Sequence, residues 1–153
     1  MTKNNLETPS IREITFQEAL ALRALVLKPH LAPHECVNPG DLRPETFHYG
    51  YFRDLELVGI ASFEKEAHPA IRGERLYRLR GMASSPQFRH QGIGRALVQA
   101  GEARLRSLGC EGLWFNARKA AFPFYRRLGY LEVGEIFEID PIGPHKVMYK
   151  YFK

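Results

Sequence analysis

The stretch FRHQGIGRAL, residues 88–97, constrains the fold of this chain more than any other segment. A β-rich run, RLYRLRGMAS, precedes it, and an amphipathic, helix-periodic segment follows. Gly92 and Gly94 leave the backbone bare at the predicted start of the helix, where amide groups are unpaired and the helix dipole is positive. The turn also carries three basic side chains: Arg89, His90 and Arg95. The pattern therefore predicts a turn that binds a phosphate group, with an ordinary turn before a helix as the alternative.

Two common phosphate-binding loops do not fit this stretch. A P-loop requires a Lys-Ser or Lys-Thr pair after its last glycine, and the chain has no such pair here. A dinucleotide-binding turn requires a small residue at the position of Leu97 and an acid where the next strand ends in Asn116. Both the P-loop and the dinucleotide-binding turn are therefore excluded.

The remaining segments predict one α+β domain. Thr15 and Glu18 form a capping box for a helix that ends before Pro29, and the proline-rich segment from Pro29 to Thr46 is irregular. The other predicted elements are strands at 10–15, 46–52, 55–64, 75–84, 112–117, 130–139 and 145–152, and helices at 92–108 and 120–129. In the second long helix we expect a buried side of Ile93, Leu97, Ala100, Leu105 and Leu108. The order β-α-loop-β-β-β-α-β-α-β-β is typical of a sheet with helices on both faces.

Composition limits the function classes without choosing among them. The length of 153 residues suits a single domain over residues 1–153. The net charge of +5 suggests anionic partners. It has no apolar stretch long enough to span a membrane and no apolar leader, so we expect a cytoplasmic protein. Cys36 and Cys110 suit buried, reduced thiols, and His30, His34 and Cys36 lack standard zinc spacing, so no metal is expected.

The motif R-x-x-G-x-G, formed by Arg89, Gly92 and Gly94, resembles the acetyl-CoA loop of the GNAT superfamily of N-acetyltransferases. MASSPQFRHQGIG is similar to the family's strand end and lead-in, and AAFPFYRRLGYLEVGE resembles its second signature. LWFNA ends a strand between them. The motif-bearing resemblance covers Leu76 to Met148, and it implies a GNAT-like, mixed, mostly antiparallel central sheet.

The resemblance implies acetyl-CoA as co-substrate, bound in a gap where the fourth and fifth strands diverge. The turn amides would hold the pyrophosphate and the strand-end backbone the pantetheine arm. Asn116 would be a second pantetheine contact, with a strand-end cap as the equal alternative. The implied cofactor-binding residues are Met82, Ala83, Ser84, Arg89, His90, Gln91, Gly92, Ile93, Gly94, Arg95 and Asn116.

Acetyl transfer to an amine needs a base, an oxyanion donor and a proton for the departing thiolate. Tyr125 matches the family's tyrosine that donates this proton, with aromatic packing as the alternative. A backbone N–H near Met82 or Ala83 would bind the oxyanion. The fourth strand lacks the glutamate that some members use as base, so the predicted proton acceptors are Glu138 or His145, or a water chain to Glu135 or Glu138.

Arg78 and Arg80 lie on one face of the fourth predicted strand. If that face lines the acceptor site, the pair would bind an acceptor with a carboxylate or phosphate, such as an amino acid or short peptide. The alternative is that both arginines pair with acidic neighbours: Glu64, Glu66 or Glu74.

The predicted function is acetyl transfer to a primary amine of a small molecule or peptide, directly in a ternary complex. A non-catalytic acyl-CoA-binding or regulatory module is the alternative. A nucleic-acid-binding domain is suggested only by net charge and lacks a recognition motif, so no nucleic acid or membrane partner is expected. Many members of the family are dimers, so a homodimer is one alternative for the assembly.

Overall fold

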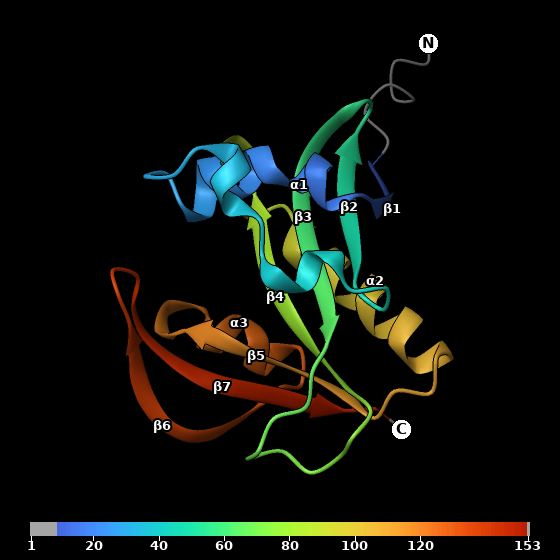
Figure 1. Cartoon of the computed structure of the whole chain (residues 1–153), viewed down its shortest axis with the longest axis vertical. Helices are drawn as coiled ribbons and strands as arrows, with labels where there is room; N and C mark the ends of the chain where they lie inside the picture. Colours follow the sequence, from blue (N-terminus) through green and yellow to red (C-terminus); the bar gives the residue numbers. More distant parts are fainter. Residues whose placement is uncertain (1–8, 153) are drawn as a thin grey trace. The chain divides into compact units, whose positions relative to one another are not determined.

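The computed structural model describes residues 9–152, which fall into two compact units. Of these residues, the first unit contains 9–64 and Arg80–Ala103, and the second contains Lys65–Leu79 and 104–152. The strands are β1 Pro9–Ile14, β2 Phe47–Arg53, β3 Glu56–Lys65, β4 Leu76–Ser84, β5 Gly112–Arg118, β6 Leu131–Ile139 and β7 Gly143–Tyr151 (Figure 1). The main helices are α1 Phe16–Leu22, α2 Ile93–Ser107 and α3 Phe122–Arg127. This is the predicted element order; the prediction of a single domain stays a prediction.

The strands form a seven-stranded sheet in the order β1-β2-β3-β4-β5-β7-β6. Neighbours pair antiparallel in β1–β2, β2–β3, β5–β7 and β6–β7. β4 and β5 pair in parallel, from Leu76 opposite Gly112 to Arg78 opposite Trp114. The mixed, mostly antiparallel sheet expected from the sequence is therefore confirmed.

In the first unit, α1 and α2 cover opposite faces of β3. Ile60 packs in a core cluster with Ala19 and Leu22 of α1. Gly59, its neighbour, faces α2, because a Cβ at Gly59 would lie 2.4 Å from Ile93. Successive side chains of a strand point to opposite faces, so one face of β3 packs against α1 and the other packs against α2.

In the second unit, β5 also has two buried faces. Trp114 lies in a cluster with Ile71, Leu76 and Val147. Phe115, on the other face, packs against Tyr125 of α3 with ring centroids 4.3 Å apart. The α3 helix tolerates Pro123 because this proline stands in its first turn, as predicted.

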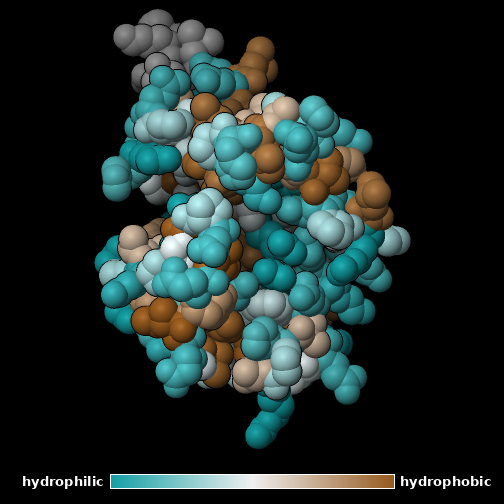
Figure 2. Space-filling model, turned by 60° about the vertical axis from the view of Figure 1, so that its left-hand side comes forward, coloured by the Kyte–Doolittle hydropathy of each residue, from teal (hydrophilic) through white to brown (hydrophobic). Residues whose placement is uncertain are grey.

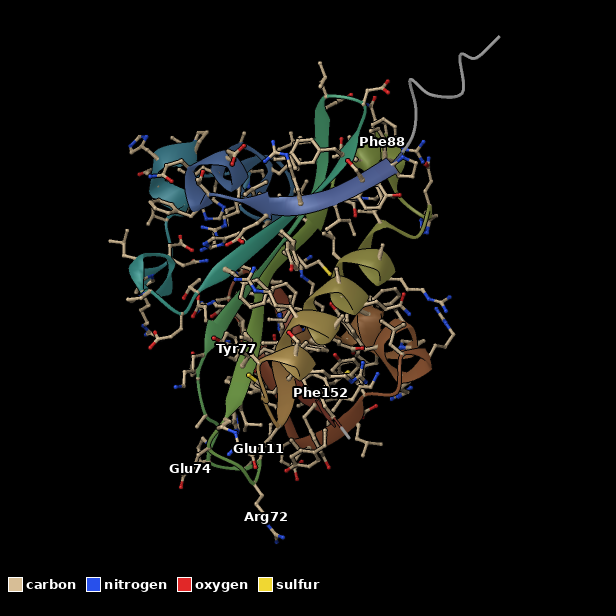
Figure 3. All side chains as sticks on the ribbon, turned by 90° about the vertical axis from the view of Figure 1, so that its right-hand side faces the viewer. Arg72, Glu74, Tyr77, Phe88, Glu111 and Phe152 are labelled. Atoms are coloured by element: carbon tan, nitrogen blue, oxygen red, sulfur yellow. The ribbon has the colours of Figure 1, made fainter. Side chains whose placement is uncertain are left out.

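A glutamate fixes the loop that leads into β4. The Glu111 carboxylate accepts hydrogen bonds from the N–H groups of Glu74 and Arg75 at 2.9 and 2.8 Å. Figure 3 labels Glu74 and Glu111, which lie close to Arg72 at one end of this unit. The loop backbone is thereby tied to the residue just before β5.

The sequence signals that predicted where helices begin and end agree with the structure. Thr15 and Glu18 form the expected capping box, and Gly109 and Gly129 adopt positive φ values of 78° and 94° just after their helices. The buried side predicted for the second long helix is wrong at Leu108, which is 57% exposed. The helix ends at Ser107, so Leu108 belongs to the terminal turn and no longer follows the helical period. Ala100 is only half-buried.

Among residues 9–152, no helix is long and apolar enough to cross a membrane. The face drawn in Figure 2 is mostly hydrophilic, with separate hydrophobic patches. Exposed large apolar residues of the first unit are Leu25, Val37, Leu42 and Leu55.

Candidate functional site

The glycine turn of the first unit lies between β4 and α2. Ser85 N–H donates to the Val58 carbonyl of β3 at 2.8 Å, and a short 3-10 turn, Pro86–Phe88, follows. His90 and Gly92 then adopt left-handed backbone conformations, with φ values of 65° and 81°. A left-handed histidine is unusual and costs conformational energy, which is typical of turns with a special geometry.

The N-terminus of α2 offers unpaired backbone donors at this turn. Ala96 N–H donates to the Gly92 carbonyl at 3.0 Å as the first helical hydrogen bond. The preceding amides, of Ile93, Gly94 and Arg95, therefore have no carbonyl one turn earlier in this helix to bond. Gly92 and the predicted cations are exposed, and no atom of residues 9–152 would lie within 4 Å of a Cβ at Gly92. The turn can accept an anion at a positively polarised helix end.

A residue that sequence reasoning missed supports this turn. Arg53, at the end of β2, donates from Nη2 to Gln91 Oε1 at 2.5 Å. Its guanidinium lies 5.4 Å from the ring centroid of Phe88, which Figure 3 labels. Arg53 and Gln91 are 38 residues apart, so no local sequence signal could have identified the pair.

The end of β4 has an irregular backbone at Gly81, where φ is 59°. Ala83 is buried in the α1 cluster, whereas Met82 and Ser84 are half-buried. A single left-handed residue interrupts the alternation of a strand. Gly81 therefore divides β4 into the part that pairs with β5 and the part that leads to the turn.

Tyr125 of the second unit is buried in an aromatic cluster. Its ring lies 4.3 Å from Phe115, 4.9 Å from Phe124 and 6.1 Å from Tyr130, measured between centroids. Burial raises the pKa of the Tyr125 phenol well above its ordinary value. The hydroxyl is therefore protonated at neutral pH and can donate a hydrogen bond.

The predicted proton acceptors lie in the β6–β7 hairpin but differ in burial. His145 is 4% exposed, and its Nδ1 lies 2.8 Å from the Gly143 carbonyl. A hydrogen bond to that carbonyl places a proton on Nδ1, so Nε2 is the acceptor in the neutral form of the imidazole. Glu138 and Glu135 are exposed. Since Phe137 pairs directly opposite His145, the Glu138 side chain points to the opposite face of the hairpin.

Strand register also separates the predicted residues of the second unit. Asn116 pairs with Val147, and Arg118 pairs with His145, so Asn116 and His145 share one face of β5 and β7. Asn116 is half-buried on the Trp114 side, while Tyr125 packs against Phe115 on the other side. The structure thus brings Asn116 and His145 to one face and Tyr125 to the other.

Each predicted acceptor-site arginine has an acidic neighbour. Arg78 Nη1 lies 3.5 Å from Glu66 Oε2, and its guanidinium lies 4.9 Å from the Trp114 ring centroid. Arg80 Nη1 lies 3.9 Å from Glu64 Oε1. Each of these pairs lies within one unit. The pairing that the sequence offered as the alternative is present for both arginines.

A buried polar network that the sequence did not reveal anchors the Pro29–Thr46 segment. Arg23 donates to both Asp41 oxygens, at 2.7 and 3.0 Å, and to Ser62 Oγ at 3.0 Å. His48 Nδ1 lies 2.7 Å from the same Ser62 hydroxyl. Burial alone would raise the pKa of Asp41, but hydrogen bonds from Arg23 and the Asn38 amide outweigh it and lower the pKa. Burial lowers the pKa of His48.

The cysteines and nearby histidines form no metal cluster within the described part of the chain. Cys36 is buried, and its thiol donates to the Ala32 carbonyl at 3.5 Å. Cys110 is half-buried, and burial raises the pKa of its thiol.

Residues 13–130 match the model of the Acetyltransferase (GNAT) family. The chain belongs to this family. It is 36% identical over 140 residues to the uncharacterized N-acetyltransferase YitI of Bacillus subtilis (strain 168), and the match covers 92% of this chain and 94% of YitI. The family makes the protein an acyltransferase that uses acyl-CoA, and the sequence-based prediction of a GNAT enzyme is confirmed.

Solved structures show the same fold. ElaA of Escherichia coli superposes with a TM-score of 0.75 at 19% identity, over 94% of this chain and 99% of that one. An aminoglycoside 6'-N-acetyltransferase in complex with coenzyme A gives a TM-score of 0.72 at 18% identity, over 93% of this chain and 96% of its own. At these identities the likeness concerns the fold alone.

Proposed function

We propose that this GNAT enzyme moves an acetyl group from acetyl-CoA to a primary amine of a small molecule or peptide, directly in a ternary complex in the cytoplasm. The observation that carries the proposal is the turn from Arg89 to Arg95. Its left-handed Gly92 and the unpaired amides at the start of α2 suit a pyrophosphate, and its exposed cations add charge.

In this proposal Tyr125 donates a hydrogen bond to the sulfur of the departing CoA. Its buried phenol keeps the proton over the whole neutral range, since burial raises its pKa. The same burial makes the phenol a weaker acid, so donation is favoured only as negative charge develops on sulfur. His145, with Nε2 as acceptor, and exposed Glu138 are the predicted proton acceptors, and they lie on opposite faces of their hairpin.

The first experiment is calorimetric titration with acetyl-CoA, with NADH and ATP as controls. We expect selective one-to-one binding of acetyl-CoA. Equal binding of all three with strong salt dependence would contradict the proposed cofactor site. Thiol release is then followed with a panel of primary amines that includes amino acids, short peptides, alkyl amines and an aminoglycoside. Binding without amine-dependent thiol release would indicate a non-catalytic acyl-CoA-binding module.

Tyr125→Phe tests the acid directly. Phenylalanine keeps the ring that packs against Phe115, so we expect a folded variant with unchanged acetyl-CoA affinity. Loss of the donor should lower kcat about 10- to 100-fold. Phe124→Leu, which changes a neighbouring ring without removing a hydroxyl, is the control for packing. An unchanged kcat in Tyr125→Phe would remove Tyr125 from the mechanism.

A further inference from the structure

Glu64, near the end of β3, is a buried carboxylate whose interactions within the chain are incomplete. Its side chain is 1% exposed, and its Oε2 atom is buried without a hydrogen-bond partner among residues 9–152. Arg80 Nη1 lies 3.9 Å from Oε1, which is longer than a hydrogen bond. A buried carboxylate is costly unless it is paired and hydrogen-bonded, so an unpartnered oxygen at this position requires an explanation.

The surroundings of Glu64 are shaped to hold its carboxylate. A Cβ at Gly40 would lie only 2.5 Å from Glu64 Cδ, so the carboxylate lies directly against the bare backbone of the short 3-10 helix Pro39–Leu42. Any side chain at Gly40 would displace it. The contact places Glu64 beside the Pro29–Thr46 segment, a loop of the kind that often contacts substrate.

The two Nη groups of the buried cation Arg23 bind other partners, whereas its Nε is buried without a hydrogen-bond partner among the described residues. Arg23 donates to both oxygens of Asp41 and to Ser62, which precedes Glu64 on the same face of β3. His48 also contacts Ser62, at 2.7 Å. Arg80 is a cation that pairs with Glu64, and its own side chain is 32% exposed. Since the Glu64 side chain is itself only 1% exposed, an incoming cation can reach the carboxylate only by displacing the partly exposed Arg80 side chain.

Glu64 also shares a face with the end of β4 that is predicted to bind acetyl-CoA. Ile60 and Glu64 point to the same face of β3, and Ala83 packs in the same cluster as Ile60. Arg80 reaches Glu64 on this face as well. Left-handed Gly81 lies between Arg80 and Ala83, which lets both residues face the same side although they are three positions apart.

We propose that Glu64 binds the acceptor amine in its ammonium form and thereby selects cationic acceptors. Arg80 holds the carboxylate when no acceptor is present, and the ammonium group replaces it. The unpartnered Oε2 is then the second hydrogen-bond acceptor for the incoming –NH₃⁺ group. The bound ammonium passes one proton to the base of the reaction before the free amine attacks the thioester. The inference rests on the proposed function, since it assigns the acceptor side of the same reaction.

Glu64→Gln tests this role because it removes the charge and preserves the size of the side chain. Glu102→Gln is the matched control: Glu102 is also a buried glutamate of the first unit, at 4% exposure. The acceptors are benzylamine, an ammonium ion at neutral pH, and aniline, which is uncharged there, together with the best amine of the panel. Loss of a charge-assisted hydrogen bond should raise KM for the ammonium acceptors about 10- to 100-fold. Acetyl-CoA affinity should stay unchanged, and aniline, if it is acetylated, should show a change of less than about threefold.

Thermal unfolding supplies a readout that needs no acceptor. A buried carboxylate with one unpartnered oxygen and a single long ion pair to Arg80 does not stabilise the empty enzyme, so the melting temperature of Glu64→Gln should stay the same or rise. A lower melting temperature with an equal loss for charged and uncharged acceptors would show a structural role and overturn the proposal. Unchanged KM values would also overturn it. If the wild-type protein binds acetyl-CoA but acetylates no amine, the proposed function fails, and the role of Glu64 fails with it.

Discussion

Replacing Gly92 with alanine should weaken acetyl-CoA binding through the backbone alone. Gly92 has a φ of 81°, and a Cβ at this position would meet no atom of the described residues within 4 Å. Alanine therefore creates no clash with its surroundings, and its cost comes from the left-handed backbone. That cost is about 1–2 kcal/mol, partly offset by the lower entropy of the unfolded alanine chain. A net loss of about 1 kcal/mol corresponds to a melting temperature about 2–4 °C lower for a chain of this size.

The binding loss should be larger than the stability loss suggests. Relaxation of the turn toward a negative φ would redirect the amides that follow Gly92 at the start of α2. If one or two hydrogen bonds to phosphate are lost, each worth about 1.5 kcal/mol, Kd should rise about 10- to 100-fold. Calorimetric titration measures this Kd directly, and differential scanning calorimetry measures the melting temperature.

Gly134→Ala is a closely matched control. Gly134 in β6 has the same φ of 81°, and a Cβ added there would likewise meet no atom within 4 Å in the part of the chain that the structure describes. The variant should lose the same 2–4 °C or so in melting temperature and keep its acetyl-CoA affinity. Equal weakening of binding in both variants would trace the effect to general destabilisation. Unchanged binding in Gly92→Ala would refute the idea that the turn conformation holds the cofactor.

The remaining predictions concern the first unit. Arg80→Ala should lower KM for cationic acceptors severalfold, because it frees the Glu64 carboxylate; a higher KM for carboxylate-bearing acceptors alone would instead support an anion site at Arg80. Asp41→Asn should cost about 3 kcal/mol of stability in chemical unfolding, since it leaves the buried Arg23 charge uncompensated. The folded state disfavours protonated His48, so stability should decline as pH falls below 6.5, and His48→Gln should flatten this decline in melting temperature. The contribution of Asp41, whose folded pKa is lowered, should be lost only below pH 3.8, as the pH falls through that lower pKa.

The elements of this fold could be predicted because their boundaries depend on neighbouring residues. The capping box of Thr15 and Glu18 starts α1, and Gly109 ends the turn after α2 with a positive φ. Such signals act over three or four positions and are visible in the chain itself. Leu108 shows the limit of periodicity, because the helical pattern continues in the sequence after the helix has ended.

The cofactor side and the acceptor side of the candidate site also differ in how far the sequence could predict them. The cofactor turn depends on backbone conformation, and glycine is the residue that permits it, so Gly92 marks the turn in the sequence. The acceptor side depends on side chains that strands and loops bring together. Glu64 can be identified as a candidate binding residue only from the folded structure, which places Gly40 against its carboxylate and Arg80 beside it. The residues next to Glu64 in the sequence do not reveal its role. The role is inferred from the missing hydrogen-bond partner of Oε2, which only the folded structure shows.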